Sequence, residues 1–380
     1  MDILVYSDDH IEFRKKVRTF MEKEVIPYVD QWEKDRVLPR SIWKKMGANK
    51  MLCTSISKKY GGMGGDFLHA VIVSEELAKT NHNGAGPSLH SDMVVPYIDS
   101  FASEENKEKF LPGCVSGDII TAFGLSEPDT GSDVASLSTS AVEKGDQVII
   151  NGAKIFTSNG ISCDLLVLVA RDPEVKSPYE SMSVYLVEAD TPGFKKGNKL
   201  DKMGWYSQDT AEVFFSDCCI PVKNRLGQKG QGWKLIMNKL QQERLLTALW
   251  AQVFAEHILT QTLDYYKGEG TSDTYVSNSQ ANQFSIVEMA TDVKIGRTFV
   301  DKLIVDHMAG EDVIIETSMA KFWITEMVRR VADRCLDIYG ITGMAETCPE
   351  ARAWRDVRCM SIFGGTNEIQ RLIIGKFMGL

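Results

Sequence analysis

Apolar residues recur with helical spacing in the first part of the chain. Between residues 8 and 26 they form one stripe, which consists of Phe13, Val17, Phe20, Met21 and Val25. This spacing predicts an amphipathic helix that buries the stripe. Asp9, with Glu12 three residues later, predicts a capping box at its start, and Pro27 predicts its end. Further helices are predicted at 39–48, 67–80 and 103–111.

The pattern changes near residue 119, where short runs of β-forming residues replace the helical period. These runs are 147–150, 165–170, 183–188 and 212–215. Asn151 and Gly152 predict a turn after the first run, and 155–157 continues beyond that turn. The stretch is therefore predicted to be a β domain, with Pro221 and the segment 224–232 as its exit.

Helical spacing returns at about residue 231 and continues to the end of the chain. The predicted long or terminal helices are 281–309, 313–338 and 367–377. This organisation predicts an α+β protein of three domains. They are an N-terminal helical domain over 1–118, a middle β domain over 119–224 and a C-terminal helical domain over 225–380.

Composition and charge exclude several classes of protein. The 380 residues are 43% hydrophobic and 25% charged, which is typical of a globular protein with a sizeable core. The net charge of −9 argues against a nucleic-acid partner, because phosphate binding needs a basic face. No stretch approaches 18 uninterrupted apolar residues, so we expect no membrane span. The acidic N-terminus resembles neither a signal nor a transit peptide, which predicts a cytoplasmic location.

The cysteines and histidines do not form a recognisable framework. None of the eight cysteines belongs to a Cys-x-x-Cys pair, and the six histidines are dispersed. This scatter predicts reduced thiols and no metal site. Cys218 and Cys219 would point to opposite sides of a strand. His90 and His307 are interpreted as structural histidines.

Two segments carry the candidate chemistry. Residues 362–370 resemble the glycine–threonine turn near the C-terminus of acyl-CoA dehydrogenases, in many of which a catalytic glutamate stands two residues before the threonine. Here that position is Gly364, which has no side chain to take a proton. A minority branch, including the long-chain and isovaleryl enzymes, carries the base on an earlier helix, and Glu243 with Arg244 and Leu245 resembles that context. The resemblance implies that Glu243 is the catalytic base.

The resemblance covers nearly the whole chain and implies a flavin site. Segment 123–133 is similar to the family's loop along the flavin ring, segment 156–160 supplies contacts to the isoalloxazine, and 366–368 follows the glycine turn. The implied cofactor-binding residues are Phe123, Leu125, Ser126, Gly131, Ser132, Phe156, Thr157, Ser158, Gln280, Thr366, Asn367 and Glu368. The implied substrate-binding residues are Ser132, Arg244, Gly364 and Gly365.

Two motifs that hold the ADP half of FAD in the family are altered. The first comes from the neighbouring subunit and would fall at Glu269, Ser272 and Asp273, in an alignment anchored on Gln280. The second has Asp337 in place of a glutamine, and Ile341 in place of a glycine. An acid is electrostatically wrong beside a pyrophosphate. FAD is therefore the expected cofactor, with weakened or altered binding, and FMN is the alternative.

Simpler interpretations compete at each position. Glu243 and Arg244 could be a solvated pair on a helix face, with Arg244 structural. Ser132 could be a turn residue and Phe156 a core aromatic, and Glu368 could only complement a helix N-terminus.

The function implied by the resemblance is flavin-dependent α,β-dehydrogenation of an acyl thioester. Removing the weakly acidic α-hydrogen needs a positioned carboxylate in a water-poor cleft, and flavin takes the hydride. The carrier is coenzyme A or an acyl- or peptidyl-carrier protein, and the electron acceptor is an electron-transfer flavoprotein or O2. We expect a homo-oligomer, as a tetramer. The rival functions are a flavin monooxygenase of the same fold and a catalytically silent binding relative.

Overall fold

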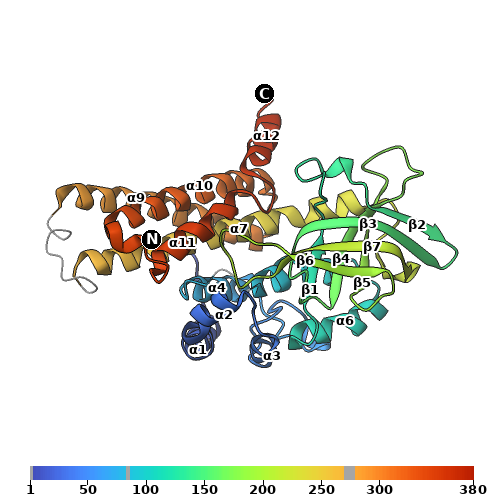
Figure 1. Cartoon of the computed structure of the whole chain (residues 1–380), viewed down its shortest axis with the longest axis horizontal. Coiled ribbons are helices and arrows are strands. Elements are labelled where there is room, and N and C mark those ends of the chain that lie inside the picture. The colour runs from blue at the N-terminus through green and yellow to red at the C-terminus, as the bar shows by residue number, and fades with distance from the viewer. Residues whose placement is uncertain (1–2, 83–85, 269–278) are drawn as a thin grey trace.

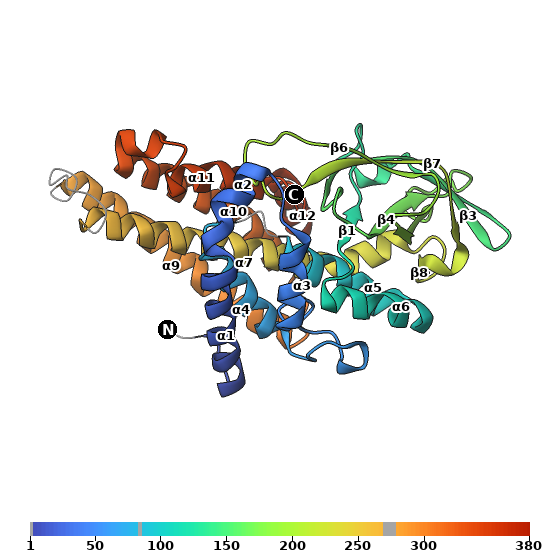
Figure 2. The same cartoon turned by 60° about the horizontal axis from the view of Figure 1, so that its bottom comes forward.

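Three long helices form the spine of the molecule. The computed structural model describes residues 3–82, 86–268 and 279–380. The long helices are α7 (Gly232–Tyr266), α9 (Gln280–Met308) and α10 (Ile314–Tyr339), which pack against one another. Figure 1 shows the sheet at one end of this bundle and the N-terminal helices below it. In Figure 2 the first helices of the chain lie across the long ones.

The N-terminal helices follow the predicted periodicity. They are α1 (Asp8–Glu24), α2 (Val29–Asp35), α3 (Arg40–Ala48), α4 (Phe67–Ala78), α5 (Val95–Phe101) and α6 (Glu104–Ser116). All five apolar residues of the predicted first stripe are buried. Helices α2 and α5 were not predicted, nor was the π-helical segment η3 (Leu89–Val94) that runs directly into α5.

The predicted capping box of α1 is wrong in its residues. Ser7 is the N-cap, its side chain accepts a hydrogen bond from the His10 backbone, and the His10 side chain accepts one from the Ser7 backbone. Asp8 and Asp9 lie in the first turn, where their charges favour the positive end of the helix dipole. Histidine fills the role that the capping-box pattern normally assigns to glutamate or glutamine.

The middle part is one sheet of eight strands. They are β1 (Thr121–Gly124), β2 (Ser140–Lys144), β3 (Gln147–Ser158), β4 (Leu165–Arg171), β5 (Met182–Glu188), β6 (Phe194–Lys199), β7 (Thr210–Pro221) and β8 (Arg225–Leu226). The order is β6-β7-β3-β2-β4-β5-β8, and β1 pairs with β4 in parallel. Strands β1, β2, β6 and β8 were not predicted. β6 is an edge strand that carries three lysines and therefore lacks a strong β-forming signal.

The predicted turn at Asn151 and Gly152 is also wrong, because β3 continues through both residues. Gly152 has φ +142°, and the pairing with β7 shifts between Ile150 and Gly152, so the glycine forms a bulge. A Cβ at Gly152 would lie 2.8 Å from the Cα of Thr139. The glycine therefore permits a close strand contact, which a sequence pattern cannot distinguish from a turn.

The C-terminal part ends with α11 (Pro349–Asp356) and α12 (Asn367–Phe377) after the long helices. Helix α7 joins two hydrophobic cores: Leu235 and Ile236 belong to the core shared with the N-terminal helices and the sheet, and Leu245 begins the core of the helical bundle. Glu243 lies between these cores. Among the described helices, none combines the length and apolar character that a membrane span requires.

Candidate active site

Glu243 lies on α7 and has one close polar partner from the N-terminal domain. The hydroxyl of Tyr97, on α5, donates a hydrogen bond to Glu243 Oε1 at 2.9 Å. Burial raises the pKa of Glu243 to about 7, and the Tyr97 bond and the more distant Arg244 and Lys239 charges oppose this rise only in part. No lysine or arginine forms an ion pair with Glu243 in the described part of the chain. The carboxyl group can therefore exchange a proton near neutral pH.

Tyr97 also connects Glu243 to the predicted flavin loop. Its ring lies 5.2 Å, centroid to centroid, from the ring of Phe123 on β1. Tyr97 is buried, and burial together with the Glu243 charge holds the pKa of its hydroxyl well above the usual range. The hydroxyl therefore remains protonated and acts as a hydrogen-bond donor. Tyr97 was not predicted, because nothing in the surrounding sequence marks it as a partner of a residue 146 positions away.

The glycine turn packs against α7 at Thr247, one helical turn after Glu243. A Cβ on Gly364 would lie 3.1 Å from Oγ1 of Thr247, and this Oγ1 donates to the backbone carbonyl of Glu243 at 2.9 Å. Gly364 and Gly365 both have positive φ, at +66° and +83°. The structure therefore brings the two alternative carboxylate positions of the family, Gly364 and Glu243, to the same region.

Arg244 points away from its neighbour in sequence. Its side chain is buried, and Nη1 donates to Ser318 Oγ on α10 at 3.0 Å. Burial lowers the pKa of its guanidinium group. The solvated Glu–Arg pair considered from the sequence does not form, and Arg244 joins α7 to α10.

The predicted flavin loop has unusual exposure and geometry. Phe156 is 66% exposed with φ +56°, at a point where the β3–β7 register is shifted. The alternative interpretation of Phe156 as a core aromatic is therefore wrong. Oγ1 of the buried Thr157 has no hydrogen-bond partner among the described residues, and a Cβ on Gly131 would meet open space. An exposed strained aromatic beside an unsatisfied hydroxyl fits a planar, hydrogen-bonding ring such as flavin.

A buried ion pair attaches the start of this loop to β3. Lys154 Nζ contacts Glu127 Oε1 at 2.8 Å and donates to the carbonyl of Leu125 at 3.0 Å. Burial would raise the pKa of Glu127, but the Lys154 charge and several hydrogen bonds hold it at about 2. Leu125 and the adjacent Ser126, whose carbonyl accepts from the Ile155 backbone at 2.9 Å, are thereby fixed to β3. Ser132 is exposed further along the same loop.

The residues after the glycine turn mainly organise α12. Thr366 caps the helix by accepting from the Ile369 backbone, and Glu368 is exposed in its first turn. Asn367 is buried and bonded to Lys321, Thr325 and Glu326. Lys321 also donates to the carbonyl of Gly365 at 2.7 Å, and burial lowers its pKa to about 7. These contacts hold the glycine turn in place, and no pattern in the sequence indicated Lys321.

Gln280 is not near the flavin loop of its own chain. It begins α9 at the end of the bundle that lies far from the sheet (Figure 1). Asp337 and the exposed Ile341 lie at the same end, where Arg334 on α10 donates to Ser285 on α9 at 3.0 Å. The ADP-binding role that the resemblance implies for these residues stays a prediction. Glu269, Ser272 and Asp273 lie outside the described residues.

A histidine and carboxylate cluster was not predicted. His10, Asp66 and His69 place their ligand-type atoms within 4.8 Å of one another. His10 Nε2 and His69 Nδ1 each lie 2.9 Å from Asp66 Oδ1, while both histidines also take part in the capping boxes of α1 and α4. Spacing within the sequence could not reveal this group, because it joins the first turns of two helices. His90 is a satisfied structural histidine, bonded to Thr121 and the Cys114 carbonyl.

Comparison with known proteins accounts for this architecture. Family models for the N-terminal, middle and C-terminal domains of acyl-CoA dehydrogenases match residues 7–118, 122–218 and 230–379. The chain is 38% identical to the mitochondrial long-chain specific acyl-CoA dehydrogenase of Rattus norvegicus, over 98% of this chain and 87% of the relative. It is 33% identical to an acyl-CoA dehydrogenase of Bacillus subtilis (strain 168), over 98% of each.

A solved structure is similar throughout. The acyl-CoA dehydrogenase from Geobacillus kaustophilus has a TM-score of 0.96 and 46% identity, with 99% of each chain covered. Fold and comparisons together define the class, which is a flavin-dependent oxidoreductase with an α+β architecture. The chain belongs to the acyl-CoA dehydrogenase family, whose members are FAD-dependent flavoproteins. The predicted fold class, family, enzyme class and cofactor are confirmed.

Proposed function

We propose that this enzyme oxidises an acyl-CoA at its α,β carbons with Glu243 as the general base. The observation that carries the proposal is the position of Glu243, bonded to Tyr97 beside Phe123 and free of any ion pair in the described part of the chain. A base works best when its pKa is near the working pH, and burial gives Glu243 a pKa of about 7. Gly364 leaves the other carboxylate position of the family empty.

Each residue then has a physical role. The Glu243 carboxylate takes the α-proton, and the Tyr97 hydroxyl stabilises the ionised form before the transfer. The flavin ring would be held by Phe156, Thr157 and Ser158 on β3, by Phe123 on β1, and by Leu125, Ser126, Gly131 and Ser132 on the loop that follows β1. Bound flavin supplies the acceptor for the hydride equivalent from the β-carbon. Gly364 and Gly365 leave space for the thioester, with backbone held by Lys321 and Gln370.

Coenzyme A is proposed as the carrier, with an electron-transfer flavoprotein as the acceptor. The names of the relatives support the first choice, since both are called acyl-CoA dehydrogenases. A carrier protein and O2 are the alternatives that an experiment must separate. The cytoplasmic location stays a prediction from the sequence.

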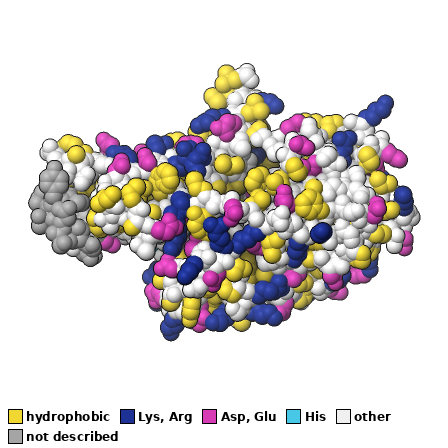
Figure 3. Space-filling model, in the orientation of Figure 1, with side chains coloured by type: hydrophobic (Ala, Val, Ile, Leu, Met, Phe, Trp, Pro, Cys, Tyr) yellow, Lys and Arg dark blue, Asp and Glu magenta, His cyan; other side chains and the backbone are white. Residues whose placement is uncertain are grey.

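We also propose a homo-oligomer, as a tetramer. Helix α12 projects from the body of the molecule (Figure 1) and carries the exposed apolar residues Leu372 and Phe377, which Met378 follows directly. Apolar side chains gather at this projection in Figure 3. Exposed Phe284 and Val287 add a second apolar surface on α9. Such surfaces favour association, and light scattering that gave a monomeric mass at micromolar concentration would contradict this proposal.

Anaerobic spectroscopy of the flavoprotein tests the proposed reaction. Acyl-CoA thioesters should bleach the flavin absorbance in the absence of any other reductant, and the product should be the enoyl-CoA. Bleaching only by an external reductase would support the monooxygenase. A protein that binds no flavin after reconstitution would support the silent relative. Either of these two results would overturn the proposal.

A further inference from the structure

The first turns of helices α1 and α4 meet at a cluster of two histidines and one aspartate. His10 belongs to α1, His69 belongs to α4, and Asp66 is the residue directly before α4. Their ligand-type atoms lie within 4.8 Å of one another, and both histidines are buried while Asp66 is exposed. The cluster can therefore be reached from solvent on the side of Asp66.

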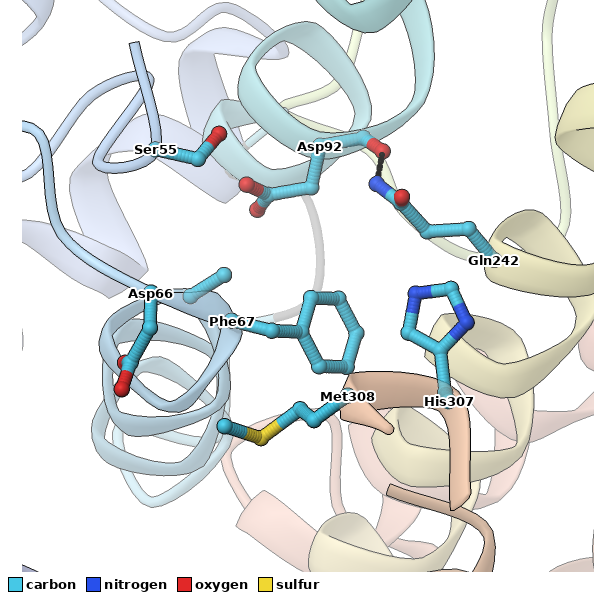
Figure 4. Close-up of a pocket in the computed structure, with 8 residues that line it drawn as sticks. Ser55, Asp66, Phe67, Asp92, Gln242, His307 and Met308 are labelled. Carbon is cyan, nitrogen blue, oxygen red and sulfur yellow. Dashed lines mark hydrogen bonds between the residues drawn. The ribbon is translucent and has the colours of Figure 1, made fainter. Parts of the chain in front are cut away.

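The Asp66 carboxylate is directed toward the two histidines. Asp66 and Phe67 both border a cavity of about 280 Å³ beside α4. Figure 4 shows the Phe67 ring pointing into this cavity and the Asp66 carboxylate pointing away from it. Asp66 Oδ1 lies 2.9 Å from His10 Nε2 and 2.9 Å from His69 Nδ1. Two ring nitrogens thus share one carboxylate oxygen.

His69 has a carboxylate oxygen at each of its ring nitrogens. Nδ1 lies 2.9 Å from Asp66 Oδ1, and Nε2 lies 3.2 Å from Asp9 Oδ2. The Asp66 backbone N–H donates to Nδ1 at 3.2 Å, which places the single proton of a neutral His69 ring on Nε2. The Nδ1 lone pair then faces a carboxylate oxygen at 2.9 Å. A cation bound to both atoms removes this repulsion.

Outer contacts orient both rings in the way that metal sites require. A metal-binding histidine almost always donates its other ring N–H to a carboxylate or a similar acceptor, which fixes the tautomer and the ring orientation. Asp9 is such an acceptor for His69 Nε2. For His10, Ser7 Oγ lies 2.9 Å from Nδ1 and can accept its proton when Nε2 binds a metal. The cluster therefore combines three ligand atoms with an outer partner for each ring.

Helix capping accounts for only part of this arrangement. Each capping box uses only Nδ1 of its histidine, which accepts from the backbone N–H of Ser7 or of Asp66 at 3.2 Å. Glutamate or glutamine normally performs the same task at this position. The contact between His10 Nε2 and Asp66 lies outside both boxes and joins α1 to α4. The pairing of two histidines on one carboxylate is thus not a requirement of the caps.

The local charge also favours a cation, although two helix N-termini oppose one. Asp8 and Asp9 lie in the first turn of α1, and Asp66 precedes α4. Among the described residues, no lysine or arginine forms an ion pair with Asp9 or Asp66. Burial would raise the pKa of Asp66, but the hydrogen bonds from His10 and His69 lower it. The shared carboxylate is therefore ionised at neutral pH and available as a ligand.

The spacing of the ligand atoms selects the kind of metal. Bonds from nitrogen and oxygen ligands to first-row ions are about 2.0–2.2 Å long. At these lengths the 2.9 Å separations correspond to an angle of roughly 90° at the metal, as in an octahedral site, whereas a tetrahedral site needs roughly 3.4 Å. Imidazole suits Fe²⁺, Co²⁺ and Ni²⁺ ions, and Mg²⁺ prefers oxygen ligands.

We propose that His10, Asp66 and His69 form a binding site for a six-coordinate divalent ion of the first transition row, with water in the remaining positions. The ion joins the first turn of α1 to the first turn of α4 and stabilises the N-terminal helices. It takes no part in the proposed dehydrogenation, so either proposal can fail without the other. The prediction of no metal site rested on the scatter of histidines along the sequence, which helix packing overrides here.

Calorimetric titration of the tag-free, metal-stripped flavoprotein tests the site, with Ni²⁺ as the probe. The wild-type protein should bind one Ni²⁺ per chain with a micromolar or lower Kd, and Mg²⁺ should not compete. Ni²⁺ should also raise the unfolding temperature, because the ligand atoms come together only in the folded chain. Absence of a saturable site for one Ni²⁺ per chain, or equal binding of Mg²⁺, would overturn the inference.

Glutamine variants separate the metal site from the helix caps. Glutamine can fill the capping role of either histidine but lacks the imidazole ligand. Without metal, His10→Gln and His69→Gln should therefore unfold close to the wild-type temperature. Their Ni²⁺ affinity should fall by at least about 100-fold, since loss of an outer partner alone costs about 10- to 100-fold. Full Ni²⁺ affinity in either variant would contradict the assigned ligands.

Two further variants complete the test. Asp9→Ala removes only the outer acceptor of His69 and should weaken Ni²⁺ binding by about 10- to 100-fold. Asp9 is exposed, so this variant keeps the test decisive if the glutamine variants do not fold. His257→Gln, on α7 and outside the cluster, is the matched control and should bind Ni²⁺ as the wild type does. Unchanged affinity in Asp9→Ala, or an equal loss in His257→Gln, would overturn the inference.

Discussion

Two glutamates beside the candidate flavin site differ in their surroundings, and the difference separates a structural role from a catalytic one. Glu127 is paired with Lys154 at 2.8 Å, and its pKa is held at about 2. Among the described residues, the carboxyl group of Glu243 is bonded only to the neutral Tyr97 hydroxyl, and its pKa is raised to about 7. Environments that move the pKa values of two carboxyl groups apart assign them different tasks. Glu127 cannot take a proton at neutral pH, whereas Glu243 can.

The largest expected effect comes from removing the basicity of Glu243. Glu243→Gln preserves the shape of the side chain, so FAD binding and oligomeric state should persist. The rate of flavin reduction by acyl-CoA should fall by at least 10²–10⁴-fold, the usual contribution of a general base. Stopped-flow absorbance measures this rate, and Glu127→Gln is the comparison that should not lose the chemical step in folded protein. A Glu243→Gln enzyme with wild-type rate would remove Glu243 from the mechanism.

Breaking the structural pair should affect stability instead. Lys154→Met leaves the buried Glu127 charge without its cationic partner, which typically costs about 3–5 kcal/mol of unfolding free energy. Lys44→Met removes an exposed partner of Asp118 and should cost less than about 1 kcal/mol. Urea unfolding of both variants measures the contrast. Equal losses would mean that the buried Lys154–Glu127 pair does not stabilise the loop as described.

A partial rescue would relocate the base. Gly364→Glu in the Glu243→Gln background places a carboxylate beside Thr247, which lies one helical turn after residue 243 on α7. The positive φ of Gly364 makes the change cost ~1–2 kcal/mol, so only part of the flavin-reduction rate should return. Gly364→Gln in the same background is the control for shape. Equal rates with glutamate and glutamine would show that the position cannot act as a base.

Some elements and site residues could be predicted from the sequence, and others could not. Periodicity predicted the long helices because their apolar faces are continuous. The family resemblance of the Glu-Arg-Leu context, together with Gly364, implied Glu243 as the base. Tyr97 and Lys321 could not be predicted, because each acts through a contact with a residue distant in sequence. Gly152 was misinterpreted because a bulge and a turn place the same demand on the backbone.

A smaller effect concerns the partner of Glu243. Tyr97→Phe removes the hydrogen bond that favours the ionised carboxylate, so the pKa of Glu243 should rise above about 7. The pH at which flavin reduction reaches half its maximal rate should shift upward, while the maximal rate at high pH changes less. Tyr60→Phe removes a hydroxyl bonded to the exposed Glu104 and should leave the profile unchanged. A downward shift in Tyr97→Phe would contradict the assigned role.

The pH dependence of flavin reduction in the wild-type enzyme tests the central claim most directly. Glu243 accepts a proton only when ionised, and its ionised fraction increases with pH through a pKa of about 7. The rate with a saturating acyl-CoA should therefore rise about tenfold per pH unit below this value and become constant above it. A rate that is flat from pH 5 to 9, or that falls as the pH rises, would contradict the assignment of Glu243 as the general base.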